Sequence, residues 1–257
     1  MNVTVTSNGR EKGSVEPLLP PNVGGNFAAD LTLAPETFPV GSTLEASGAP
    51  FFQIIAYDWL PPPTPPSRVS LFAPILRALK DVPAGSLSYS SRKVGWSLAV
   101  ITLSDKGSRG EREDLAGPLV AMLVADALPL AIVRHFLIPD EPSMLKSLLA
   151  RLALAERYNL ILTSGGTGLS ERDIAPETTL SLLDKTLPGF STAMTVASLK
   201  STPRAIISRA AAGAIDRSLV VNLPGSAKGA EENLAAILPA LDHALAKLNG
   251  DNADCGA

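Results

Sequence analysis

The feature that most constrains the fold is the stretch 159–173, in which a short aliphatic run leads directly into a glycine-rich loop. The run Leu160, Ile161 and Leu162 is typical of a strand that is buried on both faces. Glycines follow closely, at positions 165, 166 and 168. Because glycine permits positive φ and close backbone approach, N–H groups in such a loop can converge on an anion. The pattern predicts a strand that ends in a phosphate-binding loop.

Asp173, at the end of this loop, points to a second property. A carboxylate repels a bare phosphate, so its presence there indicates a bound metal ion or a group that orients the ligand. Hydroxyl groups in the same loop supply further donors, from Thr163, Ser164, Thr167 and Ser170. The alternative is a tight strand-to-helix turn that binds nothing.

Strand and helix patterns alternate after residue 95. Apolar runs predict strands at 96–103, 131–138, 160–162, 205–208 and 219–221. Apolar residues at helical spacing predict helices at 115–127, 144–152, 176–187, 190–200 and 229–248. We expect Asp114 to cap the first of these helices and Pro188-Gly189 to end the third. Such alternation predicts an α/β fold, a three-layer α/β/α sandwich with a mainly parallel sheet.

Ligands of such sheets bind beyond the carboxyl ends of the strands. Polar or glycine-containing loops follow the predicted strands at 104–110, 139–141, 164–173 and 222–226. Two of these loops are glycine-lined and two carry acids. Their convergence at one edge of the sheet would favour a ligand site over a simple turn.

The first 90 residues have a different character. Short extended runs, separated by glycines, predict a small, mainly-β module. The proline-rich run 61–66 predicts an extended linker, and the apolar spacing at 69–80 predicts a helix, although Pro74 fits a helix interior poorly. The Ser- and Gly-rich stretch 83–93 predicts a flexible boundary, which gives two domains at 1–90 and 95–250.

Composition excludes several classes of function. The 257 residues are 46% hydrophobic, which is enough for a substantial core, but they include no uninterrupted apolar run of membrane-spanning length. With Cys255 as the only cysteine and only two histidines, neither a disulfide framework nor a Cys- or His-based metal site is expected. A net charge of −3 with scattered Lys and Arg argues against nucleic-acid binding. We expect a cytoplasmic protein that binds neither nucleic acid nor membrane.

A set of short motifs carries a family resemblance. They occur in the order SDKG at 104–107, DLAG at 114–117, LIPDE at 137–141, TSGGTG at 163–168, RD at 172–173, PGF at 188–190, SRA at 208–210 and NLPG at 222–225. Together they resemble the MoaB/Mog family over residues 95–250. One departure is Ala116, which stands where the family pattern has Ser in DxSG.

The resemblance implies a function in molybdenum cofactor biosynthesis. Members of this kind transfer AMP from ATP to the terminal phosphate of molybdopterin in an Mg²⁺-dependent reaction that releases pyrophosphate. It also implies a homotrimer and, as a further partner, the molybdenum insertase. The two acidic positions of the family's catalytic site match Asp140 and Asp173, which we expect to hold Mg²⁺ directly or through water.

The same resemblance implies a set of substrate-binding residues around the predicted loops. They are Ser104, Asp105, Thr163, Ser164, Gly165, Gly166, Thr167, Gly168, Pro188, Gly189, Ser208, Asn222, Pro224 and Gly225. For Asp140, the alternative is a helix N-cap that follows Pro139.

The N-terminal segment resembles a MOSC domain that has been shortened. The similar segments lie at 3–15, 24–32, 38–45 and 71–79, and none contains a cysteine. We therefore expect a truncated, non-catalytic MOSC-like module.

Two other functions remain open from the sequence. A carrier would bind molybdopterin or its adenylate without catalysis, but it would have no need of two acids beside a phosphate loop. A nucleotide pyrophosphatase of the competence-damage type is the third hypothesis.

Overall fold

The computed structural model describes residues 2–19, 27–29, 38–60 and 71–251. The chain divides into two compact units, Met1–Gly95 with Ala155–Arg157, and Trp96–Leu154 with Tyr158–Ala257. In the described part of the chain, no helix combines the length and the apolar character needed to span a membrane.

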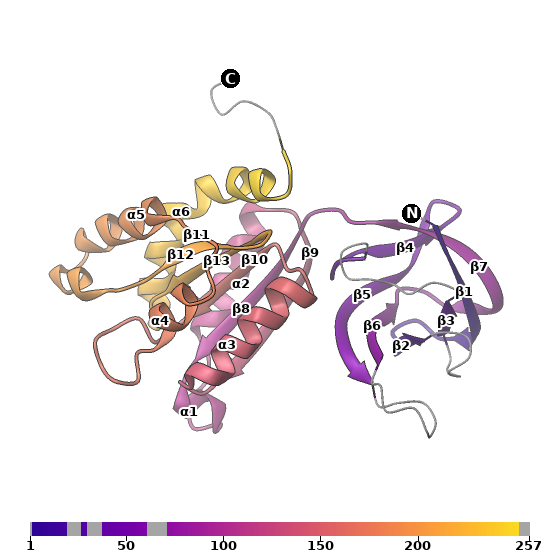
Figure 1. Cartoon of the computed structure of the whole chain (residues 1–257), viewed down its shortest axis with the longest axis horizontal. Coiled ribbons are helices and arrows are strands. Elements are labelled where there is room, and N and C mark those ends of the chain that lie inside the picture. The colour runs from indigo at the N-terminus through magenta and orange to yellow at the C-terminus, as the bar shows by residue number, and fades with distance from the viewer. Residues whose placement is uncertain (1, 20–26, 30–37, 61–70, 252–257) are drawn as a thin grey trace. The chain divides into compact units, whose positions relative to one another are not determined.

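The first unit contains a closed barrel with the strand order β1-β3-β2-β6-β5-β4-β7 (Figure 1). Its strands are β1 (Asn2–Arg10), β2 (Val15–Leu19), β3 (Phe27–Ala29), β4 (Thr43–Ala46), β5 (Ala49–Leu60), β6 (Leu71–Ala78) and β7 (Val82–Arg92). Large buried side chains, such as Phe52, Tyr57 and Tyr89, fill its core. The expectation of a mainly-β region is confirmed.

Two predictions in this unit are wrong. Residues 71–78 form β6 and not a helix, because they pair with β5 along their length, with Pro74 opposite Tyr57. Residues 82–92 form β7 and not a flexible stretch, because β1 pairs with them from Asn2 to Arg10. Most β7 side chains are exposed, so their small polar residues resemble a loop. The proline-rich run 61–66 lies outside the described residues.

The second unit is built on a six-stranded sheet with the order β11-β12-β13-β10-β8-β9. The strands are β8 (Trp96–Leu103), β9 (Leu130–Ile138), β10 (Leu160–Ser164), β11 (Lys185–Thr186), β12 (Ala212–Ile215) and β13 (Ser218–Leu223). The four strands from β13 to β9 are parallel, whereas β12 pairs antiparallel with both β13 and β11. The expected mainly parallel sheet is confirmed.

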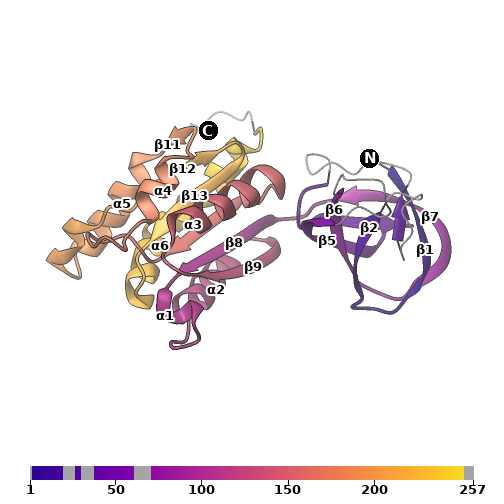
Figure 2. The same ribbon diagram turned by 60° about the horizontal axis from the view of Figure 1, so that its bottom comes forward.

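Helices cover both faces of this sheet (Figures 1 and 2). They are α1 (Asp105–Ser108), α2 (Ala116–Ala127), α3 (Pro142–Ala150), α4 (Ala175–Leu180), α5 (Pro188–Leu199) and α6 (Ala227–Leu248), with a π-helical turn η1 (Arg151–Ala155) and a 3₁₀ turn η2 (Pro203–Ile207). Buried residues of α2 and α6 share one core cluster with Leu98, Leu160 and Val221. In each strand, the residues next to these point to the opposite face of the sheet. On that face, α3 and α4 lie in contact with each other (Figure 1). The three-layer prediction is confirmed.

Local predictions failed where short apolar runs were misread. Residues 205–207 belong to η2 and Ser208 is its C-cap, so no strand forms at 205–208, and Ile206 is 73% exposed there. The helix predicted at 176–187 ends at Leu180, and β11 follows it. Pro188 begins α5 instead of ending a helix, as suits a residue with no N–H to leave unsatisfied. In α3, Leu145 and Leu149 are buried whereas Met144 is 47% exposed.

Candidate active site

Loops from four parallel strands line a cavity of about 480 Å³ at the carboxyl edge of the second unit's sheet. The loop after β8 contributes Ser104, the loop after β9 contributes Asp140, and the loop after β13 contributes Gly225. The loop after β10 contributes Gly165, Gly166 and Asp173. The structure therefore brings both predicted catalytic acids to one cavity with the predicted glycine loop.

Two glycines allow these loops to pack closely. Gly165 has φ +108°, and a Cβ there would lie 2.5 Å from the carbonyl oxygen of Leu103. A Cβ on Gly225 would lie 3.1 Å from the Cα of Gly165. The Gly165 N–H donates to the Leu223 carbonyl at 3.1 Å, which ties the two loops together. Side chains at these positions would force the loops apart.

Two helix N-termini open into the same cavity. Ser226 caps α6, where its Oγ accepts a hydrogen bond from the Gly229 N–H at 3.2 Å, and both Ser226 and Ala227 line the cavity. The first residue of α2, Ala116, lines it as well. Helix N-termini carry partial positive charge and unpaired N–H groups. These helix ends and two lining arginines, Arg112 and Arg172, favour a bound anion, whereas the acids of the lining require a cation beside it.

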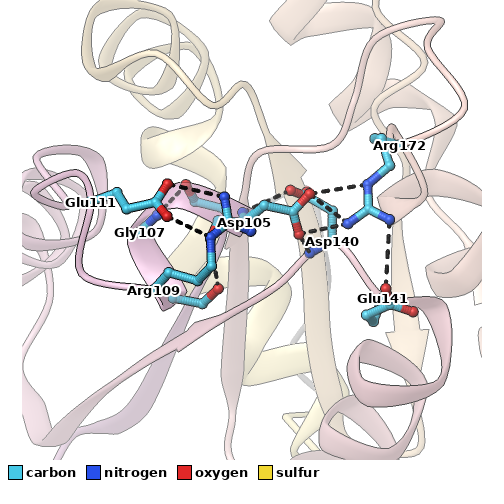
Figure 3. A network of polar contacts seen from close by, with 9 residues as sticks. Asp105, Gly107, Arg109, Glu111, Asp140, Glu141 and Arg172 are labelled. Atoms are coloured by element: carbon cyan, nitrogen blue, oxygen red, sulfur yellow. Dashed lines mark hydrogen bonds and ion pairs between the residues drawn. The ribbon is translucent and has the colours of Figure 1, made fainter.

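Asp140 is locked to Asp105 by a reciprocal pair of hydrogen bonds (Figure 3). The Asp105 N–H donates to Asp140 Oδ2 at 3.1 Å, and the Asp140 N–H donates to Asp105 Oδ1 at 3.1 Å. The side chain of each aspartate thus accepts the backbone N–H of the other, and this pair of bonds joins the loops that follow β8 and β9. Asp140 does not cap α3, because Glu141 occupies the N-cap position.

Arg172 extends this cluster. Its Nη2 donates to Asp105 Oδ1 at 2.6 Å, and its Nη1 lies 3.5 Å from Glu141 Oε1 (Figure 3). The Arg172 side chain is 54% exposed and lines the cavity. Its Nε also donates to Asp105 Oδ2 at 3.1 Å, so a bidentate, partly exposed ion pair holds Arg172 at the edge of the cavity.

The three aspartates differ in electrostatic environment. Burial raises the pKa of Asp140, and the charges of Asp105 and Asp173 raise it further. Hydrogen bonds from Arg172, and then from the Asp140 N–H, hold the pKa of Asp105 below its usual range. Burial opposes the ionisation of Asp173, but hydrogen bonds from Ser170 and Gly168 with the charge of Arg209 lower its pKa. Asp140 is the carboxylate whose charge is least compensated.

A second cavity, of about 230 Å³, lies beside the glycine loop. Four of the predicted substrate-binding residues line it: Thr167, Gly168, Ser208 and Pro224. The segment η2 contributes Arg204, Ala205 and Ile207. Eight of the fourteen predicted substrate-binding residues thus line one or the other of these two cavities, and Ser226 lines both.

Other predicted residues support the loops from within. Asn222 is buried, its Nδ2 donates to Thr163 Oγ1 and Thr179 Oγ1 at 2.9 Å each, and its Oδ1 accepts from the Ala211 N–H. Ser164 Oγ donates to the Pro224 carbonyl at 3.0 Å. Thr163, Ser164 and Asn222 line neither cavity, and the same holds for Asp105 and for Pro188 and Gly189 at the start of α5.

Replacing Asn222 by Ala should lower the free energy of unfolding by about 2 kcal/mol, because the buried Ala211 N–H and two threonine hydroxyls lose their partner. Urea unfolding followed by circular dichroism would measure the loss. As a control, Thr179→Val removes only one of the two hydroxyl oxygens that accept from the Asn222 amide and should cost less, about 1 kcal/mol. Equal losses in the two variants would contradict the role of Asn222 as the centre of this network.

Sequence reasoning missed Asp114 as a cavity residue. Its Oδ2 accepts from Thr102 Oγ1 at 2.6 Å, and its Oδ1 accepts from the Gly117 N–H at 2.9 Å. Asp114 was predicted to be the N-cap of α2, but Leu115 holds that position. Asp114 lies one residue before the N-cap and still accepts an N–H from the first turn of the helix. The D-x-x-G spacing was the available signal, because a Cβ at position 117 would lie 2.5 Å from Asp114 Oδ2.

The acids present fit a magnesium ion that is shared with a ligand. Within the described ranges, no group of three or more His, Cys, Asp or Glu side chains forms a complete metal site. Mg²⁺ commonly takes one or two carboxylates and completes its shell with phosphate oxygens and water. Asp140, whose charge is only partly compensated, and Asp173, which lines the same cavity, suit that arrangement.

The fold and the cavity define an α/β domain with a cavity beyond the carboxyl ends of its parallel strands, where ligands of such domains bind. Residues 99–243 match the family described as "Probable molybdopterin binding domain", and the chain belongs to this family. The predicted resemblance to the MoaB/Mog family is confirmed.

Relatives of known name support this membership. The chain is 36% identical over 155 residues to a molybdopterin adenylyltransferase of Helicobacter pylori, a match that covers 60% of this chain and 88% of that protein. A MoaB crystal structure from Thermus thermophilus is 45% identical, with a TM-score of 0.56, and the match covers 61% of this chain and 98% of the other. Gephyrin of Dictyostelium discoideum is 36% identical, but the chain spans only 23% of its length.

Proposed function

We propose that this chain transfers AMP from ATP to the terminal phosphate of molybdopterin and releases pyrophosphate. The observation that carries the proposal is the placement of Asp140 and Asp173 in one cavity with the glycine loop and two helix N-termini. The Helicobacter pylori relative, 88% of which is matched by this chain, bears the name of this activity.

The two cavities suit the two substrates. The larger cavity, with its helix N-termini, Arg112 and Arg172, would hold the ATP phosphates. The smaller cavity, lined by hydroxyl groups of Thr167, Ser198 and Ser208 and by apolar atoms of Ile207, would hold the pterin. The glycine loop and Ser226 border both, so the phosphate of molybdopterin could approach the α-phosphorus of ATP between them.

The reaction forms one bond and breaks another. An oxygen of the molybdopterin phosphate attacks the α-phosphorus of ATP, and the bond from this phosphorus to the oxygen that bridges to the β-phosphorus breaks. The electron pair leaves with pyrophosphate. Such transfers require positioning and charge stabilisation more than a covalent nucleophile.

Residues of this chain would supply both. N–H groups of the glycine loop and of α6 would bind phosphate oxygens, and Arg172 would add a positive charge. Asp140 and Asp173 would hold Mg²⁺ directly or through water. When bound, the ion would neutralise phosphate charge and stabilise the leaving pyrophosphate. The Asp105–Asp140 pair would keep Asp140 in place.

Domain organisation and assembly form part of the same proposal. Residues 95–250 would carry the reaction, and the N-terminal module at 1–90 would have no catalytic role. We also propose that the chain forms a homotrimer, which mass photometry would test. We propose that it passes its product to a molybdenum insertase, which a product-transfer assay would test.

The test is an adenylylation assay with purified protein, molybdopterin, ATP and Mg²⁺. Pyrophosphate and adenylylated pterin should form in equal amounts. If molybdopterin binds without turnover, the chain is a carrier. ATP or ADP-ribose hydrolysis without molybdopterin would instead identify a pyrophosphatase.

A further inference from the structure

Arg209 binds several groups around the Asp173 loop. Its Nε donates to the Gly168 carbonyl at 2.7 Å, and its Nη2 donates to the Asp173 carbonyl at 2.7 Å. Its Nη1 pairs with Glu177 at the start of α4. Each guanidinium nitrogen of Arg209 therefore already has an acceptor within the protein.

The two carbonyl groups belong to opposite ends of one loop. Gly168 and Asp173 bracket the segment that carries the catalytic acid of the proposed reaction, and the Asp173 side chain folds back to accept the Ser170 N–H at 2.8 Å. A single side chain thus fixes both ends of a short loop. Such a cross-link limits how far the Asp173 carboxylate can move.

The backbone of the same residue reaches the other cavity. The Arg209 N–H donates to the Thr167 carbonyl at 3.1 Å, and the preceding residue, Ser208, lines the smaller cavity with Thr167 and Gly168. Asp173 lines the larger cavity. Residues 208 and 209 therefore contact the lining of one cavity and hold the acid of the other.

We infer that Arg209 is a positioning residue that aligns Asp173 and couples the smaller cavity to it. The inference rests on the proposed function, because it assigns Asp173 to catalysis. Movement at Ser208 on pterin binding would pass through the Arg209 guanidinium to the Asp173 backbone. Lysine cannot substitute, because its single nitrogen cannot reach Gly168, Asp173 and Glu177 together.

The experiment compares Arg209→Lys with Glu177→Ala in the full-length chain. Arg209→Lys should lower kcat for adenylyl transfer about 10- to 100-fold while the KM for ATP changes less than about threefold, since the ATP-binding groups are intact. Glu177→Ala removes only the ion pair between the exposed Glu177 side chain and Arg209. The two hydrogen bonds from Arg209 to the loop carbonyls remain, so kcat should stay within about threefold of the wild type. Thermal unfolding of both variants would show that the fold is kept.

Binding measurements separate coupling from simple loss of structure. The affinity for a non-hydrolysable ATP analogue should depend on bound molybdopterin in the wild type and lose that dependence in Arg209→Lys. An unchanged kcat, or a parallel loss with Glu177→Ala, would overturn the inference. If the wild type and Arg209→Lys both lack turnover, the proposed function fails, and an intact coupling in Arg209→Lys would then overturn the inference separately.

Discussion

Replacing Asp140 or Asp173 by Asn should lower kcat for adenylyl transfer by at least about 100-fold, the scale seen when a group that stabilises transition-state charge is removed. Asparagine keeps the shape of each side chain but removes the charge that would hold Mg²⁺. The measurement is pyrophosphate release under saturating ATP and molybdopterin, with substrate affinities determined in parallel.

Asp114→Asn is a useful comparison for these variants. Asp114 also lines the cavity, but its oxygens already accept hydrogen bonds from Thr102 and Gly117. We expect its replacement to affect kcat less than either of the other two. Turnover near the wild-type rate in both Asp140→Asn and Asp173→Asn would refute the catalytic assignment.

Asp140→Asn should also make the protein more stable near neutral pH. Burial and two neighbouring carboxylates raise the pKa of Asp140 in the folded state, so its ionisation costs folding free energy. That cost is present above the folded pKa and disappears as pH falls below the ordinary value of 3.8, where the carboxyl is protonated in both states. The advantage of the variant should therefore fade in acid.

Urea unfolding of the wild type and Asp140→Asn, from neutral pH down to below 3.8, would test the sign of this difference in stability. The reciprocal backbone bond survives, because the amide oxygen of Asn can still accept from the Asp105 N–H. A variant that is less stable than the wild type at neutral pH would show that the ionised carboxylate is stabilising. Such a gain in stability with a loss of activity is common where a site concentrates like charge.

Replacing Gly165 by Ala should lower the free energy of unfolding by about 3 kcal/mol and abolish activity. The residue has φ +108°, which L-residues rarely adopt, and the new methyl would lie 2.5 Å from the backbone oxygen of Leu103. A strained backbone and an overpacked contact each cost roughly 1–3 kcal/mol. The neighbour is backbone in a central strand, so it cannot simply rotate away.

Gly110→Ala separates the two contributions. Gly110 also has a positive φ, of +73°, but an added Cβ there meets nothing within 4 Å. Its replacement should cost only the backbone strain, about 1–2 kcal/mol. Chemical unfolding of the two variants gives the comparison, and equal losses would mean that close packing against Leu103 is not what requires glycine at 165.

Several strands could be predicted because their own residues define them. The runs that became β8, β10 and β13 are continuous and aliphatic, as strands covered on both faces must be. By contrast, β7 is Ser- and Gly-rich and forms because β1, far away in the sequence, supplies its partner. The segment 205–207 is apolar like a strand, but it follows Pro203 in a 3₁₀ turn and none of its residues is buried.

The candidate site divides in the same way. Asp140, Asp173 and the glycines at 165, 166 and 225 were named from sequence, and all line one cavity. Asn222 was named as a substrate contact, but its buried amide spans Thr163 and Thr179. Asp114 was read only as a helix cap, although it also lines the cavity.

By itself, the sequence determined the alternation of strands and helices, the positions where only glycine fits, and the acids that follow β9 and β10. The reason is that these depend on local hydrophobic periodicity and backbone freedom. Three contacts appear only in the folded domain: Asp105 pairs with Asp140, Arg172 joins them, and Arg209 holds both ends of the Asp173 loop. Those contacts depend on which strands become neighbours in the sheet, and the order of strands is set by the packing of the whole domain.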